Sequence, residues 1–240
     1  MTAIEAKHEV VSSTRWMEAR QALLAKEKEF TRQRDQLSRQ RRELPWESVG
    51  KNYVFNGSSG EQTLGDLFEG RNQLIVYHFM LGPDWKEGCP GCSFVSDHFD
   101  GSLAHLANRG VTFVAISRAP LPQIEVFQKR MGWQFKWVSS SGSDFNFDYG
   151  VSFPEADPKA DEAPGLSVFY KEASGAIFHT YSTYARGLEP LIGAYTLLDF
   201  TPKGRNEDGI IPPMSWVRHR DRYENVPAVK PASCCHAEKQ

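Results

Sequence analysis

Two cysteines separated by two residues, Cys89 and Cys92, constrain this chain more than any other feature of its sequence. They enclose Pro90 and Gly91, follow the apolar run LIVYHFM at residues 74–80, and precede a segment that we expect to be helical. A near-continuous apolar run of this length predicts a strand that is buried on both faces. A close cysteine pair in such a place is typical of a redox dithiol or of half a metal site.

The chemistry of a helix start favours the redox interpretation. If Cys89 is the N-cap, Pro90 falls at the first helical position, where its missing N–H costs nothing. The backbone N–H groups of Gly91 and Cys92 then point at the Cys89 sulfur, and the helix dipole adds positive potential. Both effects favour the thiolate, so we expect Cys89 to be the nucleophile, and Cys92, inside the first turn, to be the resolving thiol.

Length and charge narrow the class of protein. The chain has 240 residues, a formal net charge of -2 and four cysteines. This charge gives no argument for a nucleic-acid partner or an anionic membrane. The first residues, MTAIEAKHEV, lack the layout of a signal peptide, and no apolar run is long enough to span a bilayer. We therefore expect a cytoplasmic protein, in which a close cysteine pair is catalytic or metal-binding rather than structural.

The first 45 residues predict a helical arm. Residues 12–44 read as one helix that Pro45 ends, with apolar residues every seventh position at Trp16, Leu23, Phe30, Leu37 and Leu44. The positions three residues further on are mostly polar, so the stripe is too narrow for a self-sufficient coiled coil. The arm either lies along a groove of its own domain or joins two copies into a homo-oligomer.

The rest of the chain predicts a mixed α/β domain. Two buried strands, LIVYHFM and VTFVAIS, are separated by a helix over 92–109, which implies a parallel pair with a right-handed crossover. A helix PLPQIEVFQKRMG, a short strand QFKWVSS and a long polar loop over 139–165 follow. GLSVFYKEASGAIFHTYS then predicts an antiparallel hairpin, GLEPLIGAYTLLDF a helix, and residues 201–240 an extension with a flexible tail.

This order of elements resembles thioredoxin. Stretches across residues 12–224 further resemble a bacterial thioredoxin-like family that is catalogued as a domain of unknown function, among them YHFMLGPDWKEGCPGCSF, GSDFNFDYGVSF, FHTYSTYARG and WVRHRDRY. The resemblance implies a thioredoxin-like fold over residues 46–200, with a central mixed β-sheet flanked by helices. It also implies redox activity of the cysteine pair, without naming a substrate.

The same resemblance, and the places of some residues beside the cysteine pair or at the end of a strand, indicate further site residues. Pro164 lies at the spacing of the cis-proline that faces the thioredoxin disulfide, and His78 lies at about the place of its buried acid. Trp85 and Lys86 flank the pair; the Lys86 charge would lower the Cys89 pKa, whereas Asp84 and Glu87 would raise it, and the exposure of these side chains decides between them. Arg118 follows a strand at its carboxyl end, where sites of α/β proteins gather.

The sequence also departs from peroxiredoxins, which carry Pro and Thr at fixed positions before the reactive cysteine. Here Lys86 stands three residues before Cys89 and Pro83 stands six before it, which argues against peroxide reduction. The tail brings Cys234, Cys235 and His236 together, either as a site for a thiophilic metal, or with Cys234 as the thiol that reduces a Cys89–Cys92 disulfide, or as a disordered terminus.

Three functions remain open. We expect a thiol–disulfide oxidoreductase that acts on a protein or small-molecule disulfide, with no cofactor and no bound metal. The alternatives are a copper- or zinc-handling protein on the same scaffold and a non-catalytic interaction module that uses the long helix. No third metal ligand lies at a suitable spacing beside the cysteine pair.

Overall fold

The computed structural model describes residues 8–153 and 161–224. The chain divides into two compact units, residues 1–45 and 46–240, and each is considered by itself. Within the described residues, no helix is both long enough and apolar enough to cross a membrane.

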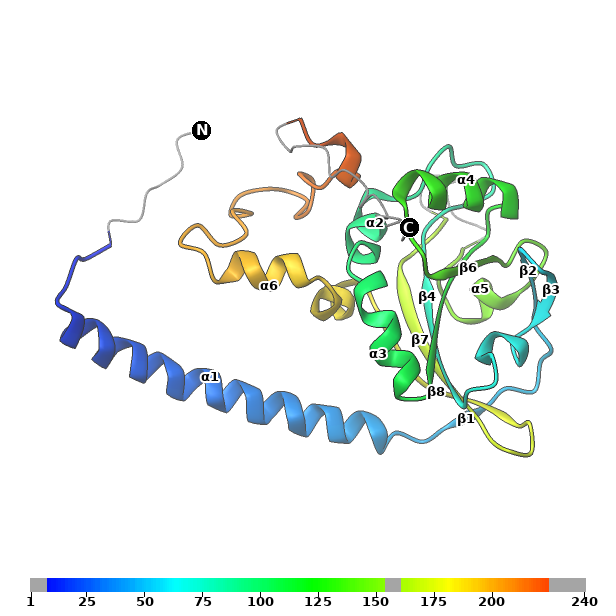
Figure 1. The fold of residues 1–240 in the computed structure, drawn as a ribbon, viewed down its shortest axis with the longest axis horizontal. Coiled ribbons are helices and arrows are strands. Elements are labelled where there is room, and N and C mark those ends of the chain that lie inside the picture. The colour runs from blue at the N-terminus through cyan, green and yellow to red at the C-terminus, as the bar shows by residue number, and fades with distance from the viewer. Residues whose placement is uncertain (1–7, 154–160, 225–240) are drawn as a thin grey trace, which may run out of the picture. The chain divides into compact units, whose positions relative to one another are not determined.

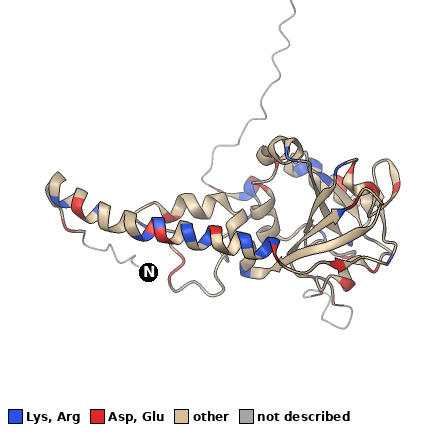
Figure 2. Cartoon of the chain, turned by 90° about the horizontal axis from the view of Figure 1, so that it is seen from below, with Lys and Arg blue, Asp and Glu red and all other residues tan. Residues whose placement is uncertain are grey.

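The first unit consists of one helix, α1 (Ser13–Arg42). Its N-cap is Ser12, whose hydroxyl accepts the Arg15 N–H at 3.3 Å, so the polar residues before the helix start it as predicted. None of its residues is buried, and charged residues of both signs are spread along it (Figure 2). The helix ends before the predicted Leu44, and its four apolar residues at seven-residue spacing are all exposed, from 48% at Leu37 to 67% at Phe30.

The second unit is built on one sheet of eight strands (Figure 1). The sheet order is β1-β8-β7-β4-β5-β6-β2-β3. The strands are β1 (Glu47–Ser48), β2 (Val54–Gly57), β3 (Gly60–Thr63), β4 (Gln73–His78), β5 (Val111–Ser117), β6 (Lys136–Ser139), β7 (Gly165–Lys171) and β8 (Ile177–Tyr184).

The centre of this sheet has the thioredoxin-like topology. Strand β4 pairs in parallel with β5 on one side and antiparallel with β7 on the other, and β7 pairs antiparallel with β8. The helix that begins at the cysteine pair, α2 (Pro90–Ser96), follows β4 directly in the chain. The predicted fold class is thus confirmed: a mixed sheet with flanking helices, a long N-terminal helix and a C-terminal extension.

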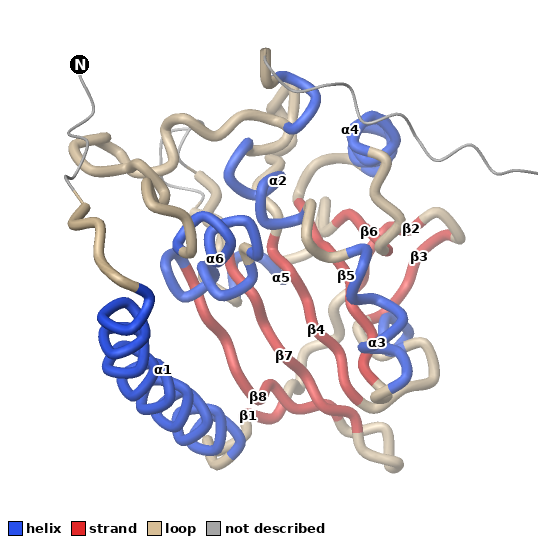
Figure 3. Tube along the Cα trace, turned by 60° about the vertical axis from the view of Figure 1, so that its left-hand side comes forward, coloured by secondary structure: helices blue, strands red, loops and turns tan. Residues whose placement is uncertain are grey.

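Both faces of the sheet are covered, and strand alternation decides which side chain serves which face (Figure 3). Leu74 and Val76 of β4 point into a core with α5 (Phe145–Asp148) and the short 3-10 helix η1 (Asp66–Phe68). Ile75 and Tyr77 point the other way, into a second core with α2, α4 (Leu121–Met131) and α6 (Gly193–Asp199). The cysteine pair belongs to this second core.

The crossover between β4 and β5 differs from the single helix expected over 92–109. It is broken into α2, the 3-10 helix η2 (Asp100–Ser102) and α3 (Leu103–Asn108). The break has a physical cause at Asp100, whose carboxylate accepts the backbone N–H groups of Gln134 and Phe135 at 3.0 and 3.1 Å. These bonds fix the chain to the loop before β6.

The last segments also differ from their predicted forms. The helix expected over GLEPLIGAYTLLDF is split into the 3-10 helix η3 (Ala185–Leu191) and α6. The described part of the extension holds a single short 3-10 helix, η4 (Arg220–Arg222), yet it buries Val217 and His219. Its Trp216 ring lies edge-on to Phe94 of α2 at 5.7 Å between centroids. The described part of the extension therefore packs against the helix that carries the cysteines.

Candidate active site

The loop before α2 brings the first cysteine back over strand β4. The Cys89 N–H donates to the Met80 carbonyl at 3.1 Å, and Ser93 donates from both its N–H and its hydroxyl to the Cys89 carbonyl. Gly88 makes this path possible, since a Cβ there would lie 2.5 Å from Phe79 and 2.7 Å from Phe127. A side chain at residue 88 would overlap two buried rings, so glycine is required for the close approach.

Cys89 is the N-cap of α2, with Pro90 at the first helical position, as the motif predicted. Its backbone is extended, with φ −58° and ψ 130°. The hydrogen bond from the Cys92 thiol, followed by the N–H groups of Cys92 and Gly91, lowers the pKa of Cys89 to about 6 against the opposing effect of burial. At neutral pH Cys89 is therefore mainly a thiolate.

Cys92 has the opposite character. It is buried, and burial raises the pKa of its thiol well above the ordinary value, with the hydrogen bond to Cys89 as the next cause. The Met80 N–H lies 3.5 Å from the Cys92 sulfur. Both cysteines are free thiols. The pair thus combines one ionised, partly accessible sulfur with one protonated, covered sulfur.

The side chain that faces this pair from β4 is Tyr77. Its hydroxyl is fully buried, has no hydrogen-bond partner among the described residues, and lies near enough to the Cys92 thiol to lower the pKa of that thiol. Burial and the two cysteines raise the pKa of Tyr77 well above its usual range, so the hydroxyl keeps its proton. The hydroxyl can donate a hydrogen bond to the Cys92 sulfur.

His78 does not lie beneath the cysteines, which corrects the role given to it from the sequence. As the next residue along β4, it points to the opposite face, where it stacks on Phe145 and Tyr149. Burial lowers the pKa of His78 to about 3, so the ring is neutral.

His78 instead ends a chain of hydrogen bonds. Its Nε2 lies 2.8 Å from the Ser167 hydroxyl, which is 2.8 Å from the Ser182 hydroxyl. Ser182 is in turn 2.7 Å from His179 Nε2, and His179 Nδ1 is 3.0 Å from the Glu47 carboxylate. These hydrogen bonds connect β4, β7, β8 and β1 on the face of the sheet away from the cysteines.

The remaining predicted residues are scattered. Pro164 lines the same cavity as the cysteines, although its peptide bond is trans, and the cis bond among the described residues is Ile211–Pro212. Trp85 packs on the core of the cysteine face, and its carbonyl accepts the Gln123 amide. Lys86 is exposed. Arg118 is bound by Asp161 and Glu162 and lies over the Phe147 ring, outside the cavity wall.

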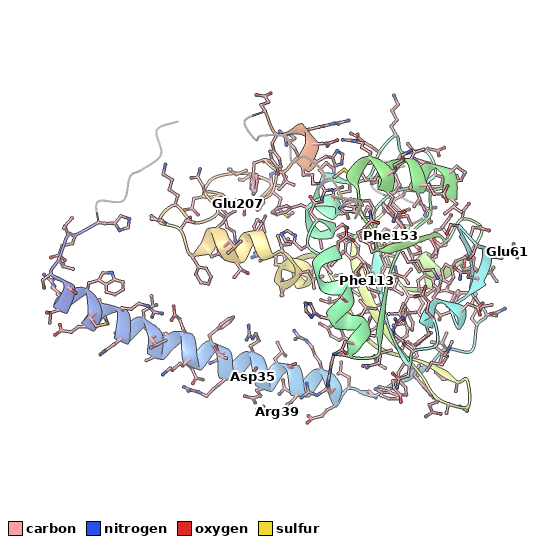
Figure 4. The ribbon with its side chains drawn as sticks, in the orientation of Figure 1. Asp35, Arg39, Glu61, Phe113, Phe153 and Glu207 are labelled. Atoms are coloured by element: carbon pink, nitrogen blue, oxygen red, sulfur yellow. The ribbon has the colours of Figure 1, made fainter. Side chains whose placement is uncertain are left out.

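A cavity of about 490 Å³ opens beside the two sulfurs. Cys89, Cys92 and Tyr77 form one wall, and residues of η3, α6 and the extension form the other. Glu207, labelled in Figure 4 on the segment after α6, belongs to that second wall. Its Oε1 accepts the Tyr195 hydroxyl at 2.9 Å, the Trp216 indole at 2.6 Å and the Met214 N–H at 3.2 Å.

The extension is also fixed to the loop before Cys89. Glu87 pairs with Arg130 of α4 at 2.9 Å and with Arg222 of the extension at 2.7 Å. Arg130 in turn pairs with Asp221 at 2.8 Å. These ion pairs, partly shielded from water, hold residues 214–222 over the start of α2.

The metal interpretation gains no support from the described part of the chain. There, no group of three His, Cys, Asp or Glu side chains is arranged to hold a metal ion. Cys234, Cys235 and His236, the other ligand set proposed from the sequence, lie outside the described residues.

The family model described as "Bacterial protein of unknown function (DUF899)" matches residues 5–223. The chain belongs to this family. No curated protein matches it in sequence.

Solved structures with a similar fold include several peroxiredoxins. Peroxidoxin BcpB from Mycobacterium tuberculosis is 13% identical, with 62% of this chain and 96% of that chain covered and a TM-score of 0.45. A mutant of PrxQ from Xylella fastidiosa is 15% identical, with 64% and 96% covered and a TM-score of 0.45. A mutant of peroxiredoxin Q from Xanthomonas campestris is 16% identical, with 60% and 90% covered and a TM-score of 0.44. At these identities and scores the comparison adds nothing about the chemistry of this DUF899 member.

Sequence reasoning missed the residues that complete the site. Tyr77 could have been found from strand alternation, because Tyr77 and His78 must face opposite sides of β4. Glu207, Met214 and His219 lie in a segment rich in Pro, Gly and charge, which predicts only an extension. No periodic pattern there signals that it packs on α2.

Proposed function

We propose that this protein is a thiol–disulfide oxidoreductase in which Cys89 is the nucleophile and Cys92 the resolving thiol. The observation that carries the proposal is the division of roles within the pair. Cys89 caps a helix with its pKa lowered to about 6, while Cys92 is buried with its pKa raised. Such a pair can attack with one sulfur and hold the other in reserve.

The reaction would run in two steps. The Cys89 thiolate attacks a disulfide, forms a mixed disulfide with one half and releases the other half as a thiolate. Cys92 then loses its proton, attacks the Cys89 sulfur and releases the second half, which leaves a Cys89–Cys92 disulfide. Tyr77, near Cys92, would stabilise the thiolate formed in the second step. The reductant that restores the dithiol is a separate protein or small thiol.

Single-cysteine variants test the assignment. Cys92→Ser should accumulate a mixed disulfide with a model disulfide, because the resolving thiol is gone, whereas Cys89→Ser should form none. Mass spectrometry of the intact protein distinguishes the adducts. Thiol titration with and without a dithiol reductant, beside metal analysis of the purified protein, serves as the control. Equal adduct formation by both variants, or a stoichiometric copper or zinc ion bound by the cysteines, would contradict the proposal.

We also propose a role for α1, namely that it joins two copies of the chain. The exposed apolar stripe of this helix favours that role. Leu23→Glu with Phe30→Glu places charges in the middle of that stripe. Analytical ultracentrifugation should then show a dimer for the wild type and a monomer for the variant. The matched control, Glu27→Gln with Arg34→Gln, alters polar positions of the same helix and should leave the dimer intact. A monomeric wild type at micromolar concentration would reject this role.

A further inference from the structure

The cavity beside Cys89 carries information about the substrate, which the proposed function leaves open. It measures about 490 Å³, and both sulfurs lie in its wall. That size suits a small molecule, since ligand pockets typically range from about 300 to 1,000 Å³. The inference below rests on the proposed redox function of this same site.

The wall that surrounds the sulfurs is apolar. It is formed by side chains that follow β4, precede β7 and α6, or belong to α2, η3 and the extension, namely Met80, Val95, Pro164, Leu188, Ile192 and Met214. Val95, Leu188 and Ile192 are themselves buried, so these surfaces are fixed parts of the core rather than mobile side chains. A substrate that fills this space gains binding energy by burying apolar groups.

Four of the five charged residues of the wall already have partners, and the fifth, Asp208, is exposed to solvent. Arg205 contacts Glu189 at 3.3 Å and Asp199 at 2.8 Å, and Arg186 contacts Glu189 at 2.9 Å. Arg205 also lies 4.0 Å over the Tyr195 ring. The Glu207 Oε1 receives three donors, which keep the pKa of Glu207 below its usual range although burial opposes them. A charged substrate would have to compete with these partners, or with the water around Asp208, whereas a neutral one would not.

The extension restricts access from outside. Met214 approaches the start of α2, where its Cε lies 3.7 Å from the position that a Cβ on Gly91 would occupy. Trp216 covers Phe94, and His219 is bound to Gly88 on the other side of Cys89. A disulfide in a folded protein would need to displace this segment before it could reach the Cys89 sulfur.

We infer that the oxidised substrate is a small, neutral, apolar disulfide that enters this cavity, rather than a disulfide of a folded protein. The electron balance is closed by the protein itself. Two thiols of the protein lose two electrons and two protons, one S–S bond of the substrate breaks, and two substrate thiols and the Cys89–Cys92 disulfide form.

A homologous series of probes tests the inference on the full-length reduced protein. Dimethyl, diethyl and dipropyl disulfide share one chemistry and differ in apolar volume. Their rate constants for oxidising the protein are divided by those for a free reference dithiol, which removes intrinsic reactivity. The ratio should rise with each added methylene, by up to about fourfold if the group is fully buried. Cystamine, dithiodiglycolate and native insulin serve as cationic, anionic and protein disulfides, and each should give a ratio at least tenfold below dipropyl disulfide.

A pair of variants connects the series to the cavity. Met214→Asn places a polar group in the wall, at a residue with φ +68°, which asparagine tolerates, and should flatten the dependence on alkyl length. Ile211→Asn, at a 92% exposed residue of the same segment outside the wall, should leave the dependence unchanged. A flat wild-type series, or insulin reacting as fast as dipropyl disulfide, would overturn the inference while the redox function stands. If Cys89 is alkylated readily but no disulfide oxidises the pair, both the inference and the proposed function fail.

Discussion

His219 Nε2 lies 2.8 Å from the carbonyl oxygen of Gly88, the residue immediately before Cys89. Because a carbonyl can only accept, Nε2 carries the proton, and Nδ1 accepts from the Arg130 guanidinium at 3.3 Å. The ring is buried and lies edge-on to Phe127 at 5.4 Å between centroids. A residue of the extension, 131 positions after Gly88, thus helps to position the loop that carries the nucleophile.

His219→Phe tests this relationship. The variant keeps an aromatic ring of similar size but leaves the Gly88 carbonyl without this donor and removes one of the two acceptors of Arg130 Nη2, which keeps Asp221. Loss of a buried hydrogen bond of this kind costs roughly 1–3 kcal/mol of unfolding free energy, which urea denaturation measures. The exposed His105→Phe is the matched control and should change stability by less than about 0.5 kcal/mol. Equal stability of the two variants would show that the bond does not fix the extension.

Gly88→Ala is expected to be destabilising for a steric reason. The new methyl group would overlap Phe79 and Phe127, two buried rings that cannot move without disturbing the core. Overpacking of this kind costs typically about 1–3 kcal/mol, so the melting temperature should fall by several degrees. Gly101→Ala is the control, because nothing lies within 4 Å of the Cβ that it would add. If calorimetry gives the same melting temperature for both variants, the close approach at Gly88 is not a constraint.

The sequence predicted the helices and strands around the site better than the residues that complete it. Patterns that are local in the chain were enough for β4, β5, α4 and the helix start at Cys89, since apolar runs, Pro90 and Gly132 act within a few residues. The break at Asp100 depends on a contact with residues 134 and 135, which no local pattern encodes. The same is true of Met214 and His219, which reach the cysteines only through the tertiary path of the extension. The position predicted for His78, beneath the cysteines, is wrong because the resemblance fixes only a place along the strand. Neighbouring residues of a strand face opposite sides of the sheet.

Tyr77→Phe is expected to slow the second step of the proposed reaction without affecting the first. The variant removes the hydroxyl near the Cys92 sulfur, so the Cys92 thiolate loses a donor. A hydrogen bond to a charged group is worth about 1.5–3 kcal/mol, which corresponds to a mixed disulfide that lives at least about tenfold longer. Quenched-flow mass spectrometry measures that lifetime, and the alkylation rate of Cys89 reports the unaffected first step.

Tyr53→Phe is the control for this variant, because its hydroxyl binds Asp148 on the opposite face of the sheet. The lifetime of the mixed disulfide should be unchanged in that protein. Tyr77→Phe should also unfold at about the wild-type urea concentration, since the hydroxyl it loses has no nitrogen or oxygen partner. If both tyrosine variants resolve the mixed disulfide at the wild-type rate, Tyr77 plays no part in resolution.

The lowered pKa of Cys89 also predicts how the reduced protein responds to pH. The rate of alkylation by iodoacetamide should rise with a midpoint near pH 6, the folded pKa, instead of near the roughly 8.5 of a free thiol.

Because the folded pKa of Cys89 lies below the unfolded one, its thiolate contributes stability that is fully present above about pH 8.5 and is lost as the pH falls through 6. Cys92, whose folded pKa is raised, has the opposite sign, and its contribution is lost only as the pH rises above its unfolded value of about 8.5. The window between pH 6 and 8.5 therefore reports on Cys89. Urea denaturation under reducing conditions at pH 5.5, 7 and 8.5 should show the wild type gaining stability relative to Cys89→Ser as the pH rises. A difference that stays constant across the three pH values, with an alkylation midpoint above 8, would mean that the Cys92 thiol and the helix start do not stabilise the thiolate.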